Sequence, residues 1–248
     1  MRWYRTKCKV GFLSKLPIVA LALFAPVAIG QVLVSPVLVD LTAEKNMFSL
    51  SITAGTGIRS SVIYQVHVQK WEQRNGQSVN SDSDDLLVSP AIAEIEPGKT
   101  QVFRVGLRKP RPDKVETAYR IIFENVSEID KSTVKPGTVT FRLSQDLPAF
   151  VAPLAPIVTT SHWSTCNAPK GKGCVRLSND GNKRIRVSDL TIMGQGWQQV
   201  LREGNGTVLA GAWKEWQFDL EKGHSQPTSI NAKTEQDVIK ADLSVPVP

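Results

Sequence analysis

The chain has 248 residues, with 41% hydrophobic residues, 21% charged residues and a formal net charge of +7. A chain of this length and apolar content can bury a sizeable core in one or two domains, which argues against a disordered protein and against a mini-fold held by disulfides alone. With 15 Pro, 17 Gly and only 3 His, it is poorly suited to long helices or to a histidine-rich metal site.

The first thirty residues predict a secretory signal peptide. They contain five basic residues and no acidic one, and the uncharged run at residues 16–30 (LPIVALALFAPVAIG) is shorter than a membrane-spanning helix. Because the uncharged region continues to residue 39, an uncleaved anchor stays open as an alternative. Cleavage after Gly30 would lower the net charge to about +2, so bulk charge gives no reason to expect nucleic acid as a partner.

Two cysteines remain after the predicted cleavage, because Cys8 lies in the signal peptide. In an exported protein, the pair Cys166 and Cys174 predicts a disulfide, whose small ring would stabilise the fold by roughly 2–3 kcal/mol. The alternative is a metal site. It would need further ligands, and His162 is the only additional candidate nearby.

Short strand-like segments separated by turns follow the signal peptide, and no long segment has helical periodicity. Residues 62–71 show the pattern well, because Val62, Tyr64, Val66 and Val68 fall on one face and Gln65, His67 and Gln69 on the other. Residues 75–85 are expected to form a polar loop and residues 96–98 a turn. The strands predicted in the first half cover residues 31–41, 47–53, 62–71, 86–89, 100–107, 119–126 and 139–151.

The pattern restarts after a candidate hinge at residues 153–156, where two prolines stiffen the backbone. Tight turns are predicted at residues 180–182 and 204–206. The strands predicted in the second half cover residues 173–178, 185–192, 199–202 and 216–220. These segments predict an all-β chain made of two antiparallel, immunoglobulin-like β-sandwiches.

The sequence carries no recognisable catalytic or cofactor motif, such as GxSxG, HExxH, GxxxxGK[ST] or CxxC, so we expect no enzyme, no cofactor and no metal. His67 and His224 have no paired acid or nucleophile and are interpreted as surface residues. The acidic segment of Asp82, Asp84 and Asp85 lacks the glycine and distal glutamate of an EF-hand and predicts a solvated loop.

One segment could serve either the core or a partner. Val139, Phe141 and Leu143 alternate with polar residues just before the hinge. In a plain sandwich strand this apolar face would point into the core. On an exposed edge it would be an aggregation hazard unless another chain paired with it by strand addition.

The order of several motifs resembles the periplasmic chaperones of the chaperone–usher pilus pathway, the PapD-like family. The strongest is the ending at residues 150–153 (FVAP) after an alternating strand. The others are residues 44–53 (EKNMFSLSIT), 87–90 (LVSP), 97–104 (PGKTQVFR), 116–120 (ETAYR), 178–182 (SNDGN) and 208–211 (VLAG).

The resemblance implies two immunoglobulin-like domains in an L-shape with a cleft between them. It divides the chain into a signal peptide (1–30), a first domain with the subunit-binding donor strand (31–152), a hinge (153–156) and a second domain (157–248). It implies a periplasmic protein that binds pilus subunits and delivers them to an outer-membrane usher, with no stable membrane insertion after signal cleavage. Whether the free form self-associates stays open.

The resemblance also places the alternating side chains of the donor strand at Val139, Phe141 and Leu143, which favours strand donation over the core interpretation. The family's usual basic anchors for a subunit carboxylate fall near Val37 and Pro148, and neither position is basic. Ala152 also replaces the basic residue that usually precedes the closing proline. These departures, together with residues 147–150 (LPAF), favour a divergent, archaic-type branch.

Arg120 and Arg142 are the candidate substitutes for the carboxylate anchor, because a guanidinium binds a carboxylate bidentately. Arg120 could instead form a surface ion pair with Glu116 or Glu124, and Arg142 could lie on a solvated face. A different function also stays open. An exported adhesin or carbohydrate-binding module would use Trp213 and Trp216, whereas a secreted hydrolase is disfavoured by the missing catalytic constellation.

Overall fold

The computed structural model describes residues 32–58, 60–128, 137, 142–201 and 205–243. The predicted signal peptide therefore lies outside the described residues. Every regular element in the described ranges is a β-strand. These ranges contain no helix that is long and apolar enough to cross a lipid bilayer.

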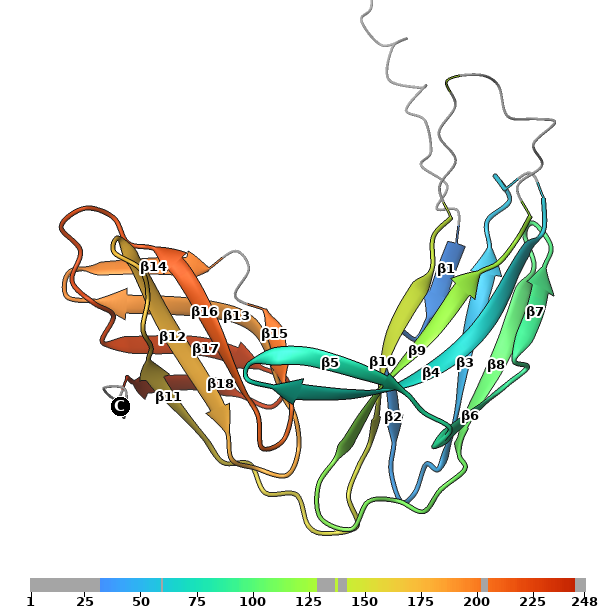
Figure 1. Ribbon diagram of the computed structural model, residues 1–248, viewed down its shortest axis with the longest axis horizontal. Coiled ribbons are helices and arrows are strands. Elements are labelled where there is room, and N and C mark those ends of the chain that lie inside the picture. Colours follow the sequence, from blue (N-terminus) through green and yellow to red (C-terminus); the bar gives the residue numbers. More distant parts are fainter. Residues whose placement is uncertain (1–31, 59, 129–136, 138–141, 202–204, 244–248) are drawn as a thin grey trace, which may run out of the picture.

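Ten strands form a first sandwich of two facing sheets (Figure 1). One sheet has the order β1-β3-β8-β6, and the other has the order β2-β10-β9-β4-β5, with β7 also paired to β4. The strands are β1 (Val32–Ser35), β2 (Val39–Leu41), β3 (Met47–Ala54), β4 (Val62–Arg74), β5 (Gln77–Asp82), β6 (Leu86–Ser89), β7 (Ile92–Ile95), β8 (Thr100–Leu107), β9 (Thr117–Asn125) and β10 (Gln145–Val151).

The core of the first sandwich follows from the alternation of apolar residues along its strands. Tyr64 on β4 and Phe123 on β9 are fully buried, and Phe123 meets Phe103 of the opposite sheet edge-to-face at 4.9 Å between ring centroids. Because side chains alternate across a strand, β9 turns Tyr119 and Ile121 to the same core and turns Arg120 to the outer face of its sheet.

Eight strands form a second sandwich with sheets β11-β12-β16 and β14-β13-β17-β18, in which β15 also pairs with β13. Trp163 and Trp216 stack in its core at 5.6 Å between ring centroids. The strands are β11 (Ser161–Thr165), β12 (Lys172–Asn179), β13 (Ile185–Gly194), β14 (Trp197–Leu201), β15 (Gly206–Val208), β16 (Trp213–Asp219), β17 (Ser229–Thr234) and β18 (Val238–Asp242).

The structure corrects two expectations about individual strands. The polar loop predicted at residues 75–85 is wrong, because β5 occupies most of it and pairs with β4 to form a long hairpin. A strand was predicted at residues 139–151. Among the described residues of that range, the strand β10 begins only at Gln145, and residues 142–144 are irregular. Residues 139–141 lie outside the described residues.

Candidate functional site

The two sandwiches meet at an angle, and the β4–β5 hairpin reaches from the first across to the second (Figure 1). At the junction, the outer face of the β2-β10-β9-β4-β5 sheet packs on the loop after β15. The buried side chains there form what we call the inter-lobe cluster. Its members are Trp71, Ala118 and Phe150 from the first sandwich and Leu209 from the second, with Leu38 and Ala212 at its margin.

A buried arginine joins the two sandwiches beside this cluster. Arg184, whose side chain is 4% exposed, reaches from the second sandwich to Glu116 at 2.7 Å and to Asp40 at 2.9 Å. The Arg184 backbone N–H also donates to Glu116 (2.9 Å), and its guanidinium lies 3.8 Å above the ring of Phe150. Burial raises the pKa of Glu116 above its ordinary value, and the Arg184 charge opposes part of that rise.

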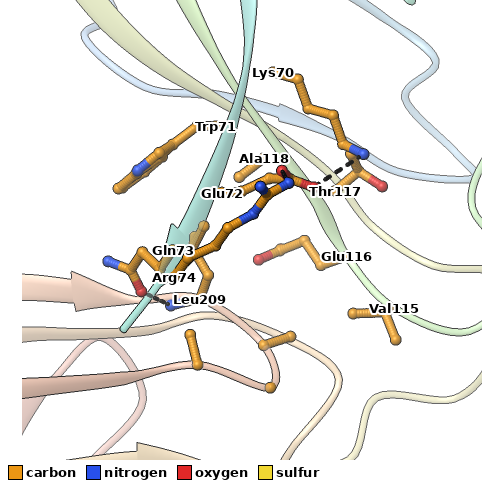
Figure 2. A pocket seen from close by; sticks show the side chains of 13 residues that line it. Lys70, Trp71, Glu72, Gln73, Arg74, Val115, Glu116, Thr117, Ala118 and Leu209 are labelled. Carbon is orange, nitrogen blue, oxygen red and sulfur yellow. Dashed lines mark hydrogen bonds and ion pairs between the residues drawn. The ribbon is translucent and has the colours of Figure 1, made fainter. Parts of the chain in front are cut away.

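The hairpin adds polar contacts between the sandwiches. The Gln73 side-chain amide donates to the Thr207 carbonyl at 2.8 Å. It also accepts from the Leu209 N–H at 2.9 Å, as Figure 2 shows. At the hairpin tip, Gly76 has φ = +72° and packs so closely on Trp213 that an added Cβ would overlap the indole ring. Through these contacts the β4–β5 hairpin of the first sandwich is bound to the second sandwich.

The pocket drawn in Figure 2 lies between the sandwiches, and its cations are already paired. Lys70 and Arg74 both reach the Glu72 carboxylate, at 3.4 and 2.7 Å. Their hydrogen bonds, that of Lys70 foremost, hold the pKa of Glu72 below its ordinary value. The positive side chains that line this pocket therefore offer no unpaired charge to an anion.

Arg120 lies in the middle of the outer sheet face, next to the inter-lobe cluster. Its guanidinium stacks 3.9 Å from the ring centroid of Trp71, and its Nη1 lies 3.6 Å from Asp146 on β10. The Trp71 indole N–H in turn donates to Ser78 at 3.1 Å. Directly opposite Arg120 on β10 is Pro148, one of the two positions near which the resemblance places the family's usual basic anchors.

The alternative interpretation of Arg120 as the partner of Glu116 or Glu124 is wrong. Glu116 belongs to the Arg184 pair, and Glu124 lies 3.2 Å from His67. The other candidate anchor, Arg142, is exposed just before β10. The structure thus brings Arg120, but not Arg142, into a defined site.

The strand that was expected to continue the donor segment has an open edge. β10 pairs with β9 along its whole length, but it pairs with β2 only at residues 149–151. Along residues 145–148, no strand among the described residues occupies the edge opposite β9. Leu143, just before this edge, is 57% exposed, whereas Val139 and Phe141 lie outside the described residues.

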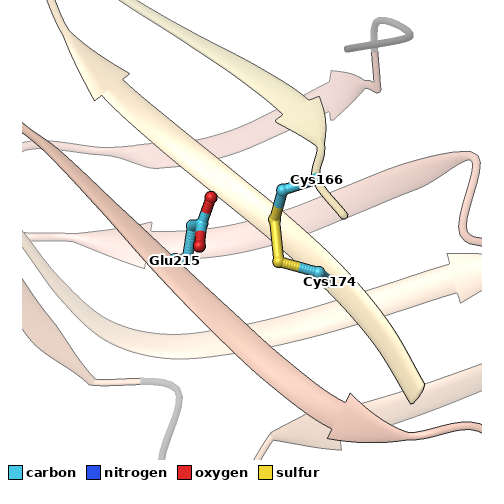
Figure 3. Close-up of side chains that lie close together, drawn as sticks. All are labelled: Cys166, Cys174 and Glu215. Carbon is cyan, nitrogen blue, oxygen red and sulfur yellow. A yellow bond between two sulfur atoms is a disulfide. The ribbon is translucent and has the colours of Figure 1, made fainter. Parts of the chain in front are cut away.

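The predicted disulfide between Cys166 and Cys174 is present (Figure 3). Glu215 lies close to both sulfurs, but the sulfurs are bonded to each other and Glu215 pairs with Arg176 at 2.6 Å. His162 pairs with Asp180 at 3.0 Å. The residues considered for a metal site are therefore engaged with other partners.

The acidic segment before β6 is bonded as well as solvated. Lys109 lies 2.7 Å from Asp85 and 3.1 Å from Asp84, and its hydrogen bonds hold the pKa of both carboxyls below the ordinary value. The Tyr119 hydroxyl donates to Asp85 at 3.0 Å. Asp82 lies in β5, so the expectation of a solvated loop is wrong for Asp82, whereas Asp84 and Asp85 lie in the loop before β6.

The tryptophans of the second sandwich do not form a platform for a sugar. Trp216 is 5% exposed and belongs to the core. Trp213 contacts Gly76 of the hairpin, and the Arg176 guanidinium lies 4.2 Å from its ring centroid. Core and interface packing accounts for both residues, which leaves the carbohydrate-binding alternative without its proposed surface.

Sequence reasoning missed Arg184, Gln73 and Trp71. A basic residue after the predicted turn at residues 180–182 gives no sign that it binds a glutamate 68 positions earlier. Trp71 had a weak signal, because it ends an alternating strand on the polar side. An apolar residue on a polar face is a sign of a second packing surface.

Comparison with known proteins identifies the family of the chain and agrees with the fold described above. The model of the pili and flagellar-assembly chaperones, PapD N-terminal domain, matches residues 31–156. No curated protein sequence matches the chain. Among solved structures, a chain of the CsuC–CsuE chaperone–tip adhesion subunit complex from the archaic Csu pili of Acinetobacter baumannii is 20% identical, with a TM-score of 0.65 over 88% of this chain and 100% of that chain.

Two further solved structures are similar over most of their length. The chaperone DraB of E. coli is 15% identical, with a TM-score of 0.61 over 86% of this chain and 96% of that chain. A chain of the Salmonella enterica SafA pilin–SafB chaperone complex is 14% identical, with a TM-score of 0.59 and the same coverage of 86% and 96%. At these identities the structural matches establish the fold, and the prediction of two immunoglobulin-like sandwiches is confirmed.

Proposed function

The chain belongs to the family of pili and flagellar-assembly chaperones, and on that basis we propose how it serves as a pilus-assembly chaperone. In this proposal it captures an incomplete pilus subunit in the periplasm by donating a strand, without catalysing a reaction and without a cofactor. It then passes the subunit to an outer-membrane usher. The CsuC and SafB structures support the capture step by analogy, because their descriptions name chaperones in complex with pilus subunits.

The open edge of β10 is the observation that carries the proposal. An unpaired edge exposes main-chain N–H and C=O groups that can add a further strand. Because side chains alternate with period two, an extended chain running back from Leu147 would place Leu143, Phe141 and Val139 on one face. Leu143, the described member of this set, is largely exposed and can contact a partner that lacks a strand.

Arg120 supports the proposal as the anchor for a subunit carboxylate. Its register opposite Pro148 puts a guanidinium beside the position where the family's basic residue is missing. Stacking on Trp71 fixes the plane of that guanidinium from one side. Arg142 is proposed as a secondary contact, exposed at the start of the same segment. The likeness to the Csu chaperone complex supports the archaic-type branch.

A set of charge substitutions tests strand donation. The variant with Val139→Asp, Phe141→Asp and Leu143→Asp is expected to remain a folded monomer and to lose subunit co-purification, because three carboxylates cannot be buried in an apolar groove. The matched control adds the same charge to the opposite face of the same segment. Its changes are Thr138→Asp, Thr140→Asp and Ser144→Asp.

The control variant should retain most of the subunit captured by the wild-type chain. Equal recovery of subunit with the first variant and the wild-type chain would overturn strand donation. Circular dichroism of both variants establishes that the sandwiches are intact. The readout is the subunit-to-chaperone ratio after co-expression with a pilus subunit from the same operon.

A further inference from the structure

The proposed anchor already holds a carboxylate in the free chain. Asp146 lies on β10 opposite Ile122, one diagonal position from Arg120, and both side chains project from the outer face of the sheet. The Arg120 Nη1 and the Asp146 Oδ1 are 3.6 Å apart. The Arg120 guanidinium therefore already has a carboxylate beside it in the free chain.

The pair is loose compared with the buried pair at the junction. Arg184 and Glu116 approach to 2.7 Å with both side chains at least nine-tenths buried, whereas Asp146 is 52% exposed and its nearest oxygen lies outside hydrogen-bond distance of Arg120. Water can replace Asp146 at little cost. The Trp71 ring stacks on the guanidinium and takes no part in the ion pair with Asp146. It would therefore keep the guanidinium in place when the carboxylate leaves.

We propose that Asp146 occupies Arg120 in the free chain and gives it up to a carboxylate of the captured partner. The inference rests on the proposed function, in which Arg120 is the anchor. In the free protein Asp146 competes with small carboxylates for the guanidinium. A partner that also pairs with the edge of β10 displaces Asp146 with the help of its strand contacts, so capture favours partners that offer both a carboxylate and a strand.

The competition can be measured with sodium acetate at constant ionic strength. The Arg120 Nε–H is buried, so its side-chain resonance in a ¹⁵N-labelled mature chain is shielded from solvent exchange and reports on ligands at the guanidinium. We expect Asp146→Asn to bind acetate about threefold more tightly than the wild-type chain, which is the size of effect that partly exposed ion pairs have. The matched control is Glu124→Gln, which removes an exposed carboxylate that pairs with His67 on the same sheet.

Three outcomes would overturn the inference. They are equal acetate affinity in the wild-type chain and Asp146→Asn, a gain in Glu124→Gln as large as that in Asp146→Asn, and an Arg120 resonance that does not respond to acetate in either protein. The proposed function is tested separately by subunit capture. If Arg120→Ala captured subunits as well as the wild-type chain, Arg120 would not be the anchor. Equal acetate affinity in the wild-type chain and Asp146→Asn would refute only the role of Asp146.

Discussion

Replacing Arg184 with Met should lower the unfolding free energy of the protein, because it breaks the ion pair between the two sandwiches. Arg184 is 4% exposed and Glu116 is 3% exposed, so the change leaves a carboxylate buried without its counter-charge. Removing one partner of a buried pair typically costs about 3–5 kcal/mol, because the remaining charge keeps its desolvation penalty. For a folded chain of this size, a loss of that order lowers Tm by roughly 6–20 °C.

Scanning calorimetry of a chain that begins at residue 31 measures this loss, and two further variants identify its cause. Arg184→Met combined with Glu116→Leu removes both charges and should recover most of the lost stability. Arg186→Met removes an exposed arginine that lies 3.6 Å from Glu235, and should change the stability by about 1 kcal/mol or less. A loss of less than about 1 kcal/mol in Arg184→Met would refute the account of a desolvated pair at the junction.

The same variant should respond to pH with a definite sign. Burial raises the pKa of Glu116 above its ordinary value of 4.5, so its contribution to stability is fully present below that value and falls as the pH rises through the folded-state pKa. Loss of the Arg184 charge raises that pKa further. The penalty of Arg184→Met should therefore be larger at neutral pH than near pH 5, and a penalty that shrinks with rising pH would contradict this reasoning.

Two further predictions concern the second sandwich and the hairpin tip. Replacing Cys166 and Cys174 with Ser should lower the unfolding free energy by about 2–3 kcal/mol in urea titrations, and an unchanged midpoint would mean that the ring adds nothing. Gly76→Ala should cost about 1 kcal/mol or more and shift the fluorescence of Trp213, because a Cβ there is strained and overlaps the indole. The control Gly57→Ala has open space around its Cβ, and an equal effect at both glycines would contradict this assignment.

The sandwich architecture was predictable because its signal is local. Along β4, Tyr64, Val66 and Val68 alternate with Gln65 and His67, and the structure buries Tyr64 fully. β5 was missed because all six of its residues are exposed, so it has no apolar alternation to detect. The turn before it was nonetheless readable. Asn75 and Gly76 both have positive φ, at 51° and 72°, and Asn-Gly between two strands is a strong hairpin signal.

The contacts between the sandwiches could not be predicted, because they depend on how two separately patterned halves dock. Arg184 and Glu116 meet across 68 positions, and neither lies in a motif that names its partner. Arg120 was identified as a substitute because the family's usual basic anchors are absent. Its expected ion-pair partners, Glu116 or Glu124, were wrong, because it pairs with Asp146. The position of Asp146 next to it depends on the register of β10 with β9, which the sequence pattern leaves free.

In the proposed function, the segment running into β10 supplies a strand to a pilus subunit. Amide hydrogen exchange of residues 138–148, in the free chain and in complex with a co-expressed subunit, tests it most directly. We expect strong protection on binding along the edge that faces away from β9, centred on residues 139–143. Unchanged exchange in this segment, with protection confined to other parts of the chain, would contradict strand donation.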